Sequence, residues 1–329
     1  MKHPIAVLLA AWYRKGHRDL PWRRTSDPYR IWISEIMLQQ TRAQTAIPYY
    51  LRFLERFPTV EALASAGEDA VLALWSGLGY YSRARNLRKT AQEVAARGAF
   101  PRRCGELRGL AGIGDYTAAA IASIAFGEPR AAVDGNVLRV VARVENDAAD
   151  IGSAKTRERF RTVANEWIDA KAPGEFNQAL MELGATVCLP RNPRCGQCPL
   201  AERCRARAQG TAAQLPVKLR RIKSAAIEAG VLVVRSRGRV LLRRRPADAR
   251  RMAGFWDLPA PEDLPGIRVG EKLGEFRHTI TRHRFRFTVR VARARRAETA
   301  DFRWMRPAEL SGIPLSTTAR KALHVAGIG

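Results

Sequence analysis

The sequence is poor in acidic residues and contains no long apolar run. Its 329 residues include 31 Asp and Glu against 57 Lys and Arg, a formal net charge of +26. Because so much positive charge repels itself, it favours a polyanionic partner, with nucleic acid first and an anionic membrane surface second. The sequence also lacks a signal peptide, a transmembrane run and a lipidation motif, which weighs against a membrane partner and a secreted protein. A hydrophobic content of 46% indicates a folded protein and excludes a disordered basic tail.

Cysteine is scarce as well, yet four of the five cysteines fall in one short window. Cys188, Cys195, Cys198 and Cys204 have the spacing C-x6-C-x2-C-x5-C, which predicts a four-thiolate metal site on one loop. Such a set suits a [4Fe–4S] cluster, whereas zinc sites usually combine two close pairs across a longer spacer. A plain zinc loop remains the rival interpretation, and two disulfides would require a secreted protein. The fifth cysteine, Cys104, is expected to fill the core.

The chain is organised into a helical part and a mixed part. Residues 1–210 show helical periodicity with caps and breakers, residues 211–224 form a charged linker, and residues 225–329 have the pattern of an α+β module. Both parts are basic, with 31 basic against 21 acidic residues up to residue 210 and 26 against 10 beyond it. We therefore expect both to face the same polyanion. The predicted helices are residues 4–15, 29–57, 61–66, 68–75, 81–97, 118–126, 155–170, 307–310 and 317–325, and the predicted strands are 226–235, 239–245 and 285–291.

A glycine-containing turn joins a short helix to an apolar helix near the middle of the chain. In the segment LAGIGDYT, residues 110–117, Gly112 and Gly114 permit a tight turn and a close approach of the backbone. The helix that follows would point its free N–H groups and the positive end of its dipole outward, and these bind a phosphate without reading sequence. We predict a helix-hairpin-helix motif over about 104–127, with Gly112, Gly114 and Thr117 at the DNA.

Two carboxylates occupy positions that suit acid–base chemistry. Asp134 precedes an apolar-periodic helix, which predicts an N-cap that stays ionised because the helix N-terminus favours negative charge. Glu35 lies in the apolar segment of residues 31–38, where loss of solvation would make it hold its proton more readily, as a general acid must. The alternative for Glu35 is a position on the wet face of its helix.

These pieces together resemble the adenine DNA glycosylase (MutY) family of the endonuclease III superfamily. The resemblance covers nearly all of residues 1–210 and continues weakly at residues 255–259. It implies an all-α helix-hairpin-helix glycosylase domain with an iron–sulfur loop at residues 188–204, followed by an α+β Nudix-like domain. The matching segments are residues 20–23 (LPWR), 34–41 (SEIMLQQT), 77–86 (GLGYYSRARN), 110–117, 133–137 (VDGNV) and the cysteine loop.

The resemblance also implies an activity, the residues that perform it and a DNA partner. Members remove adenine mispaired with 8-oxoguanine or guanine by hydrolysing the N-glycosidic bond, which leaves an abasic site. Glu35 matches the acid that protonates the adenine, and Asp134 matches the carboxylate that stabilises the positively charged sugar or briefly bonds to it. Tyr116 stands where bifunctional relatives carry a lysine that forms a Schiff base, so the sequence favours a monofunctional enzyme. We expect a monomer that binds double-stranded DNA holding such a mispair in a bacterial cytoplasm, associated with the nucleoid.

Further residues are implied as contacts to DNA. Gln40 and Tyr80 match residues that wedge into the duplex where the adenine leaves the stack, and Arg83 follows in the same motif. The second domain of the family reads the lesion with a turn that commonly reads Phe-Ser-His.

Here the best match to that turn lies at residues 278–283. Thr281 keeps a hydroxyl, and His278 and Arg282 flank it, but the aromatic residue is absent. No Nudix hydrolase signature is present, so we expect no nucleotide pyrophosphatase activity.

Three alternatives stay open on sequence alone. One is a bifunctional endonuclease III-like glycosylase and lyase, and another is a mismatch glycosylase without strict dependence on 8-oxoguanine. The third is a non-enzymatic DNA-binding protein with a redox-responsive cluster. The pairing of Glu35 with Asp134 argues against the third, because a binding protein needs neither a desolvated acid nor a fixed anion beyond the hairpin.

Overall fold

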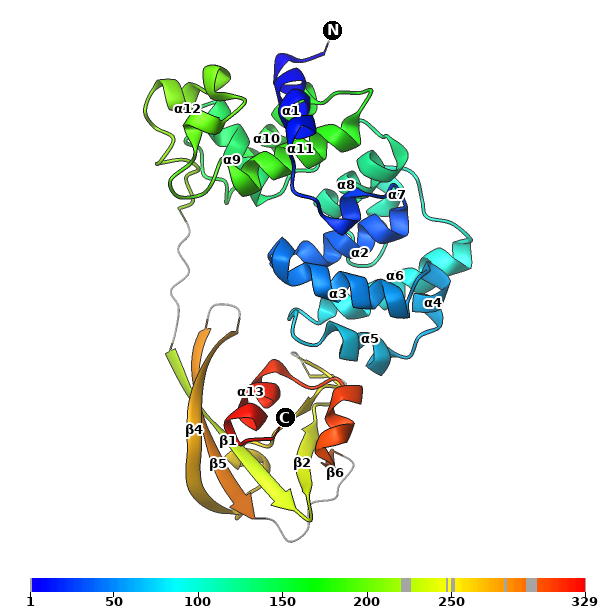
Figure 1. The fold of residues 1–329 in the computed structure, drawn as a ribbon, viewed down its shortest axis with the longest axis vertical. Coiled ribbons are helices and arrows are strands. Elements are labelled where there is room, and N and C mark those ends of the chain that lie inside the picture. Colours follow the sequence, from blue (N-terminus) through cyan, green and yellow to red (C-terminus); the bar gives the residue numbers. More distant parts are fainter. Residues whose placement is uncertain are drawn as a thin grey trace. The chain divides into compact units, whose positions relative to one another are not determined.

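The chain forms two compact units in the computed structural model (Figure 1). Residues 1–64 and 89–221 make up the first, the helical unit, and residues 65–88 and 222–329 make up the second, the sheet unit. The predicted change of character beyond residue 210 lies near this division. Residues 65–88, however, group with the sheet unit, although the sequence places them in the first domain. The structure describes residues 2–219, 226–246, 248–249, 252–280, 283–293 and 301–328.

The helices of residues 1–210 are mostly short and follow the predicted pattern over most of this part of the chain. The helical pattern over residues 29–57 is two helices, because the backbone becomes extended at Gln39 and left-handed at Gln40, with φ +61°. The described helices are α1 (Pro4–Lys15), α2 (Pro28–Leu38), α3 (Ala43–Arg56), α4 (Val60–Ser65), α5 (Glu68–Trp75), α6 (Ser82–Arg97), α7 (Cys104–Leu107), α8 (Asp115–Phe126), α9 (Gly135–Val144), α10 (Ala154–Trp167), α11 (Pro173–Thr186) and α12 (Arg205–Ala208), with 3-10 turns η1 (Pro21–Arg23), η2 (Cys195–Gln197) and η3 (Ala201–Arg203).

Helix α11 was not predicted from the sequence, yet it contacts α1, α8 and α9. Phe176, Ala179, Leu180 and Leu183 form a buried apolar stripe at the helical spacing i, i+3, i+4 and i+7, a pattern that the sequence analysis overlooked. At Gly184 the neighbouring helix comes very close, since a Cβ placed there would lie 2.6 Å from the Cβ of Asn136. The glycine thus allows α11 to pack directly against the first turn of α9.

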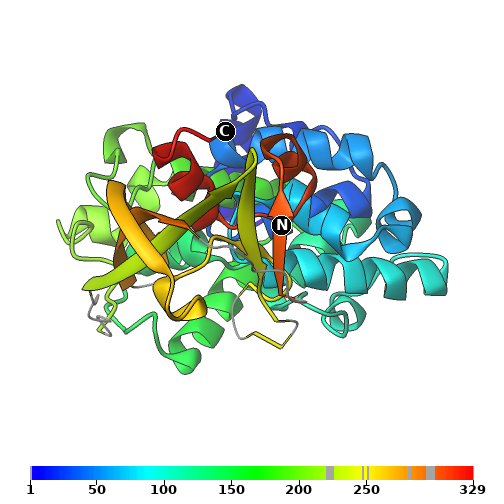
Figure 2. The ribbon, with the colours of Figure 1, turned by 90° about the horizontal axis from the view of Figure 1, so that it is seen from below.

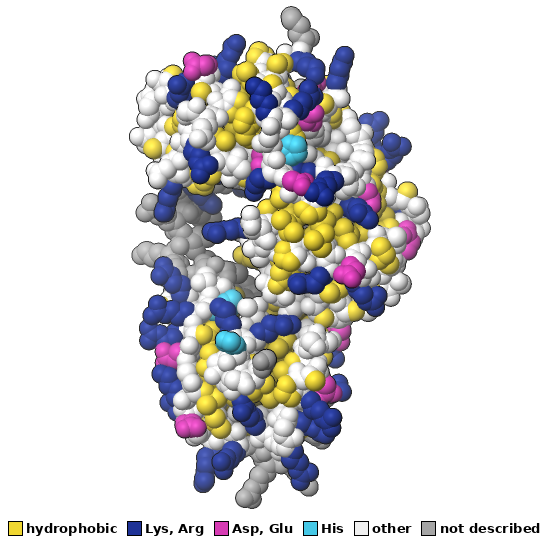
Figure 3. Space-filling model, viewed as in Figure 1, with side chains coloured by type: hydrophobic (Ala, Val, Ile, Leu, Met, Phe, Trp, Pro, Cys, Tyr) yellow, Lys and Arg dark blue, Asp and Glu magenta, His cyan; other side chains and the backbone are white. Residues whose placement is uncertain are grey.

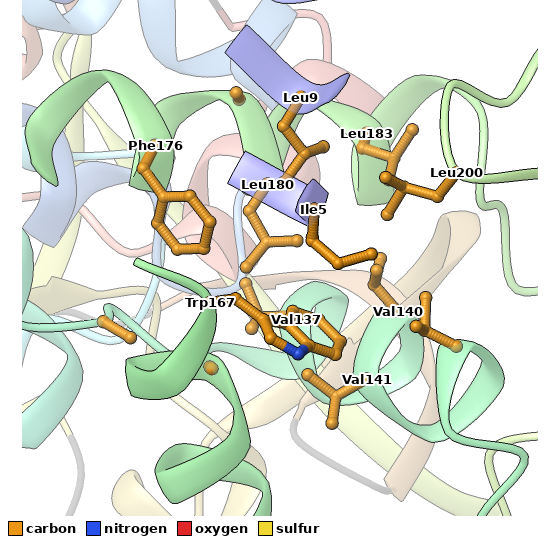
Figure 4. Close-up of a cluster of buried hydrophobic side chains, with 14 of the residues drawn as sticks. Ile5, Leu9, Val137, Val140, Val141, Trp167, Phe176, Leu180, Leu183 and Leu200 are labelled. Carbon is orange, nitrogen blue, oxygen red and sulfur yellow. The ribbon is translucent and has the colours of Figure 1, made fainter. Parts of the chain in front are cut away.

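One apolar cluster holds these helices together (Figure 4). Side chains from α1, α9, α10 and α11 converge in it, and a leucine from the cysteine loop joins them. Burial of this much apolar surface fixes α9 from several sides. The labelled members are Ile5, Leu9, Val137, Val140, Val141, Trp167, Phe176, Leu180, Leu183 and Leu200.

The sheet unit is built on a mixed sheet with the strand order β3-β2-β1-β5-β4, and β6 pairs with β2 (Figure 2). Strands β1 and β5 run parallel, and β4 and β5 form an antiparallel pair. The predicted hairpin between β1 and β2 is present, with left-handed Arg237 and Gly238 at its turn. The elements are β1 (Ala226–Ser236), β2 (Arg239–Arg244), β3 (Trp256–Asp257), β4 (Arg268–Ile280), β5 (His283–Arg293), β6 (Phe302–Met305), 3-10 turns η4 (Pro261–Asp263) and η5 (Pro307–Gly312), and α13 (Thr317–Val325).

Both faces of the sheet carry apolar clusters. Val231 and Val233 of β1 join the larger cluster, which includes Ala322 and Leu323 of α13. Alternate residues of the same strand join a smaller cluster on the other face. Strand β4 escaped prediction because most of its side chains are exposed or only partly buried, so it lacks a regular apolar alternation. Among the described residues, none of the helices has the length and apolarity to cross a bilayer.

Candidate functional site

A cavity of about 680 Å³ lies within the helical unit, bordered by α2, α8, α11, η1 and the start of α9. Glu35, Tyr116 and Asp134 all line this cavity. The fold therefore brings together the three residues predicted to be catalytic, which lie on different helices. A concave site with convergent polar groups is the usual form of an active site.

Glu35 is buried on α2, with 4% of its surface exposed. Its position on the wet face of the helix, the alternative left open by the sequence, is therefore wrong. Burial raises the pKa of Glu35 to about 7; the hydrogen bond from Tyr116 opposes this rise and the nearby Asp134 adds to it. A carboxyl with this pKa holds a proton for much of the time at neutral pH, as a general acid requires.

Asp134 caps the N-terminus of α9, as the sequence predicts. Its Oδ1 accepts hydrogen bonds from the backbone N–H of Asn136 at 2.9 Å and of Val137 at 2.8 Å, and its Oδ2 accepts from Asn136 Nδ2 at 2.8 Å. The pKa of Asp134 lies above its ordinary value, because burial raises it more than these three hydrogen bonds lower it. All three donors stabilise the ionised form of Asp134. The two carboxyl groups of the cavity, Glu35 and Asp134, therefore lie in different environments.

Tyr116 links the first turn of α8 to the acid on α2. Its hydroxyl donates to Glu35 Oε2 at 2.6 Å and lies 3.0 Å from Met181 Sδ. Burial and the neighbouring carboxylates hold the pKa of Tyr116 well above its ordinary value, so the hydroxyl keeps its proton. Among the described side chains that line this cavity, none is a lysine.

Two arginines that line the cavity, Arg18 and Arg23, bind a buried carboxylate that sequence reasoning missed. Glu182 of α11 is 2% exposed and accepts from Arg18 at 2.7 and 2.8 Å and from Arg23 at 2.7 Å. Burial would raise the pKa of Glu182, but the two guanidinium groups hold it at about 2. The sequence signal that could have found this group is the segment LPWR, which contains Arg23. The partner of Arg23, Glu182, lies on α11, the helix that was not predicted.

A chain of hydrogen bonds connects Asp134, the N-cap of α9, to the cysteine loop. Asn136, which donates to Asp134, accepts from Arg139 Nη2 at 2.9 Å, and Arg139 Nε donates to the Cys188 carbonyl at 2.8 Å. At the other end of α9, Arg143 Nη1 donates to Cys188 Sγ at 3.3 Å. Helix α9 thus carries the catalytic candidate at its start and supports the loop at its end.

The four loop cysteines line one small cavity together with Arg143, and none of the four forms a disulfide. Burial raises the pKa of Cys198 to about 11, and the other three thiols add to this effect. The set is therefore a close group of thiols that a cationic centre would deprotonate. Within the described part of the chain, no three His, Cys, Asp or Glu side chains are spaced to hold one metal ion.

The helix-hairpin-helix turn lies between α7 and α8, as predicted. Gly112 has φ +75°, whereas Gly114 has an extended backbone and caps α8, so only Gly112 needs the conformational freedom of glycine. Both are exposed. Thr117 requires a correction, because its side chain is only 1% exposed and its hydroxyl accepts from Gln39 Nε2 at 3.3 Å. Its side chain joins α2 to α8 and is not on the surface.

The two predicted wedge residues share an uncommon backbone. Gln40 in the helical unit is exposed with φ +61°, and Tyr80 in the sheet unit is 48% exposed with φ +51°. Such strain in non-glycine residues often accompanies function. Arg83 is a second correction: it is 8% exposed, and its guanidinium donates to the carbonyls of Gly79 at 3.1 Å and Leu78 at 3.3 Å. Arg83 therefore supports the turn that carries Tyr80, and its side chain is not on the surface.

Comparison with known proteins agrees with this arrangement. Residues 33–166 match the family of HhH-GPD superfamily base excision DNA repair proteins, residues 188–204 match the iron–sulfur binding domain of endonuclease III, and residues 230–325 match the NUDIX domain. The adenine DNA glycosylase of Homo sapiens is 46% identical over 218 residues, which are 63% of this chain and 40% of the human protein. That of Arabidopsis thaliana is 38% identical over 297 residues, 78% of this chain and 47% of the plant protein.

The chain belongs to the adenine DNA glycosylase family. It spans about half the length of the curated relatives that it matches.

Solved structures support the fold of this family member. A thermostable thymine-DNA glycosylase matches with a TM-score of 0.55 and 28% identity, over 62% of this chain and 95% of that one. A non-covalent endonuclease III–DNA complex matches with a TM-score of 0.53 and 23% identity over 62% of this chain and 94% of that one, which shows the fold alone. The predicted architecture, a helix-hairpin-helix domain with an iron–sulfur loop followed by a Nudix-like domain, is confirmed.

The cofactor prediction is also confirmed for this adenine DNA glycosylase family member. The match of residues 188–204 identifies an iron–sulfur binding domain, and the cofactor is a [4Fe–4S] cluster. Four thiols on one loop are the donor set that such a cluster takes. The plain zinc loop is thereby excluded as the interpretation of this segment.

Of the predicted lesion-reading residues, the structure describes His278. His278 lies near the end of β4, is half-buried, and pairs in register with Phe285. Burial lowers the pKa of His278, and Lys321 lowers it further, so the imidazole is neutral near pH 7. Thr281 and Arg282 lie outside the described residues.

Proposed function

We propose that this chain excises adenine mispaired with 8-oxoguanine, or with guanine, from double-stranded DNA. The reaction is hydrolysis of the N-glycosidic bond and leaves an abasic site. One observation carries this proposal: a buried carboxyl with a pKa of about 7 and a hydrogen-bonded carboxylate line the same cavity.

Glu35 supplies the proton. Adenine leaves more easily as a neutral base than as an anion, so a proton must reach the ring as the bond to the sugar stretches. Glu35 is the buried acid of the cavity, and the hydroxyl of Tyr116 holds its Oε2 in one orientation. The orientation leaves Oε1 of Glu35 available to the base.

Asp134 stabilises the positive charge that develops on the sugar. The three hydrogen bonds to its oxygens fix the carboxylate before the reaction begins, so little reorganisation is required in the transition state. Water then completes the hydrolysis. Tyr116 has no amine with which to form a Schiff base, which supports a monofunctional enzyme over a glycosylase and lyase.

The remaining parts bind and present the DNA. Lys and Arg side chains are spread over the visible face of both units and outnumber Asp and Glu there (Figure 3), which suits a phosphate backbone. Gln40 and Tyr80 enter the duplex where the adenine leaves it, and the N-terminus of α8 binds a phosphate. His278, near the end of β4, reads the 8-oxoguanine together with Thr281 and Arg282, which lie outside the described residues.

The cysteine loop has a structural part in this proposal. Cys188, Cys195, Cys198 and Cys204 ligate the [4Fe–4S] cluster, which supplies a rigid cross-link when bound. The exposed side chains of Arg191, Arg194 and Arg203 are then held outward on the loop for contact with phosphates. We further propose that the protein acts as a monomer on nucleoid DNA in a bacterial cytoplasm.

The test is a single-turnover excision assay with a duplex that holds adenine opposite 8-oxoguanine. Wild type should release adenine, and Glu35→Gln and Asp134→Asn should each be slower by several powers of ten while still binding the duplex. Glu55→Gln is the matched control, because Glu55 is exposed on α3 of the same unit. Release of adenine by Glu35→Gln at close to the wild-type rate would remove Glu35 from the mechanism.

A further inference from the structure

The turn that carries the exposed Tyr80 belongs to the sheet unit. Residues 65–88 comprise α5, this turn and the start of α6, and they pack with residues 222–329. The match to the glycosylase family, residues 33–166, runs straight through them. We propose that residues 222–329 of the sheet unit support this turn and thereby position Tyr80 for entry into the duplex. The inference rests on the proposed function, in which Tyr80 is a wedge.

Polar contacts tie the turn to the region around the start of α13. Ser76 Oγ donates to the Leu315 carbonyl at 2.8 Å and accepts from Arg320 Nε at 3.1 Å. The hydroxyl of Tyr81 lies 3.4 Å from Thr317 Oγ1. The residues on both sides of the exposed tip are therefore hydrogen-bonded to one short stretch of the sheet unit.

Aromatic packing anchors the same turn. The ring of Tyr81 lies against that of Phe255, with centroids 4.0 Å apart, and Phe255 is fully buried. Arg85, one turn further on, donates to the Ala253 carbonyl. The buried Tyr81 thus fixes the position of its exposed neighbour Tyr80 in the folded unit.

The turn needs such support because Tyr80, unlike the two glycines before it, is strained in a left-handed conformation. Gly77, Gly79 and Tyr80 all have positive φ, at 105°, 71° and 51°. Trp75 Nε1 and Arg83 Nη2 both donate to the Gly79 carbonyl at 3.1 Å, which holds the turn from within. A left-handed tyrosine persists only where its surroundings determine it, and the contacts to the sheet unit are those surroundings. Ser76, Tyr81 and Phe255 are therefore positioning residues.

A double-mutant cycle in the full-length protein tests this role. Ser76→Ala removes both hydrogen bonds to the sheet unit and leaves Tyr80 intact. We expect it to slow single-turnover excision roughly five- to tenfold and to slow it no further in a Tyr80→Ala background, because the two changes act through one group. Ser76→Thr keeps the hydroxyl and should keep the rate. Ser311→Ala is the control, since Ser311 is exposed and bonds only within its own 3-10 turn.

A second readout separates this inference from the proposed function. Hydrogen exchange of the amides of residues 76–81, measured without DNA, should become faster in Ser76→Ala and stay unchanged in Ser311→Ala. The inference would be overturned by unchanged amide exchange in Ser76→Ala. It would also be overturned if Ser76→Ala lowered the excision rate equally in the wild-type and the Tyr80→Ala backgrounds. Failure of wild type to release adenine would overturn the proposed function and leave the exchange experiment as the test of the support itself.

Discussion

Replacement of Glu35 by glutamine should remove activity and stabilise the fold at the same time. Burial makes the ionised carboxylate unfavourable in the folded chain, and the amide of glutamine is nearly the same shape without the charge. A carboxyl whose pKa rises from 4.5 to about 7 costs about 3 kcal/mol of unfolding free energy once it is ionised.

The sign of this effect follows from proton binding. Below pH 4.5 the carboxyl is protonated in both the folded and the unfolded chain, so it has no such cost. As the pH rises from 4.5 to 7, the unfolded chain gives up its proton first, and the wild type loses stability relative to Glu35→Gln. Above pH 7 the loss is complete and constant.

Thermal unfolding at pH 5 and pH 8 measures this difference. At pH 8 the midpoint of Glu35→Gln should exceed that of wild type by on the order of 5–10 °C, and at pH 5 by far less. Glu55→Gln, on the exposed surface of α3, should show no such dependence on pH. If the difference between Glu35→Gln and wild type were the same at both pH values, Glu35 would have an ordinary pKa and the acid role would lose its physical basis.

Three further changes have distinct outcomes. Tyr116→Phe removes a hydrogen bond that lowers the pKa of Glu35, so the alkaline limb of the pH profile for excision should move to higher pH; an unmoved limb would show that this bond does not tune the acid. Glu182→Ala leaves two arginines without their buried partner and should lower the unfolding free energy by about 3–5 kcal/mol, a loss that a thermal scan detects and an unchanged midpoint would contradict. Cys198→Ser should lose iron and visible absorption and bind the mispaired duplex more weakly, whereas full iron content by elemental analysis would show that this thiol is not a ligand.

The burial of Glu35 and the capping role of Asp134 were predictable because their signals are local. An apolar segment around Glu35 indicated desolvation, and a periodic helix after Asp134 indicated an N-cap; both features are present in the structure. The cysteine spacing likewise lies within one loop. Such features depend on neighbours in the chain, so they can be recognised before the fold is known.

Features that depend on tertiary packing were missed or misplaced. Glu182 lies on α11, whose apolar periodicity was overlooked, and its partners Arg18 and Arg23 are far from it in the chain, so that only the fold brings them together. Thr117 and Arg83 were assigned to DNA from their motifs, yet both are buried by contacts that only the fold reveals. The packing of residues 65–88 against residues 222–329 also cannot be recognised in the sequence, because the contacts join positions more than 160 residues apart.

The most direct test of the central claim is a gel assay of strand integrity after excision. Wild type is incubated with a duplex that holds adenine opposite 8-oxoguanine, and the products are resolved with and without hot alkali. The cavity of Glu35, Asp134 and Tyr116 predicts an intact abasic strand that only alkali cuts. Efficient nicking without alkali, with a covalent protein–DNA adduct trapped by borohydride, would contradict hydrolysis at this site and show that an amine acts as the nucleophile.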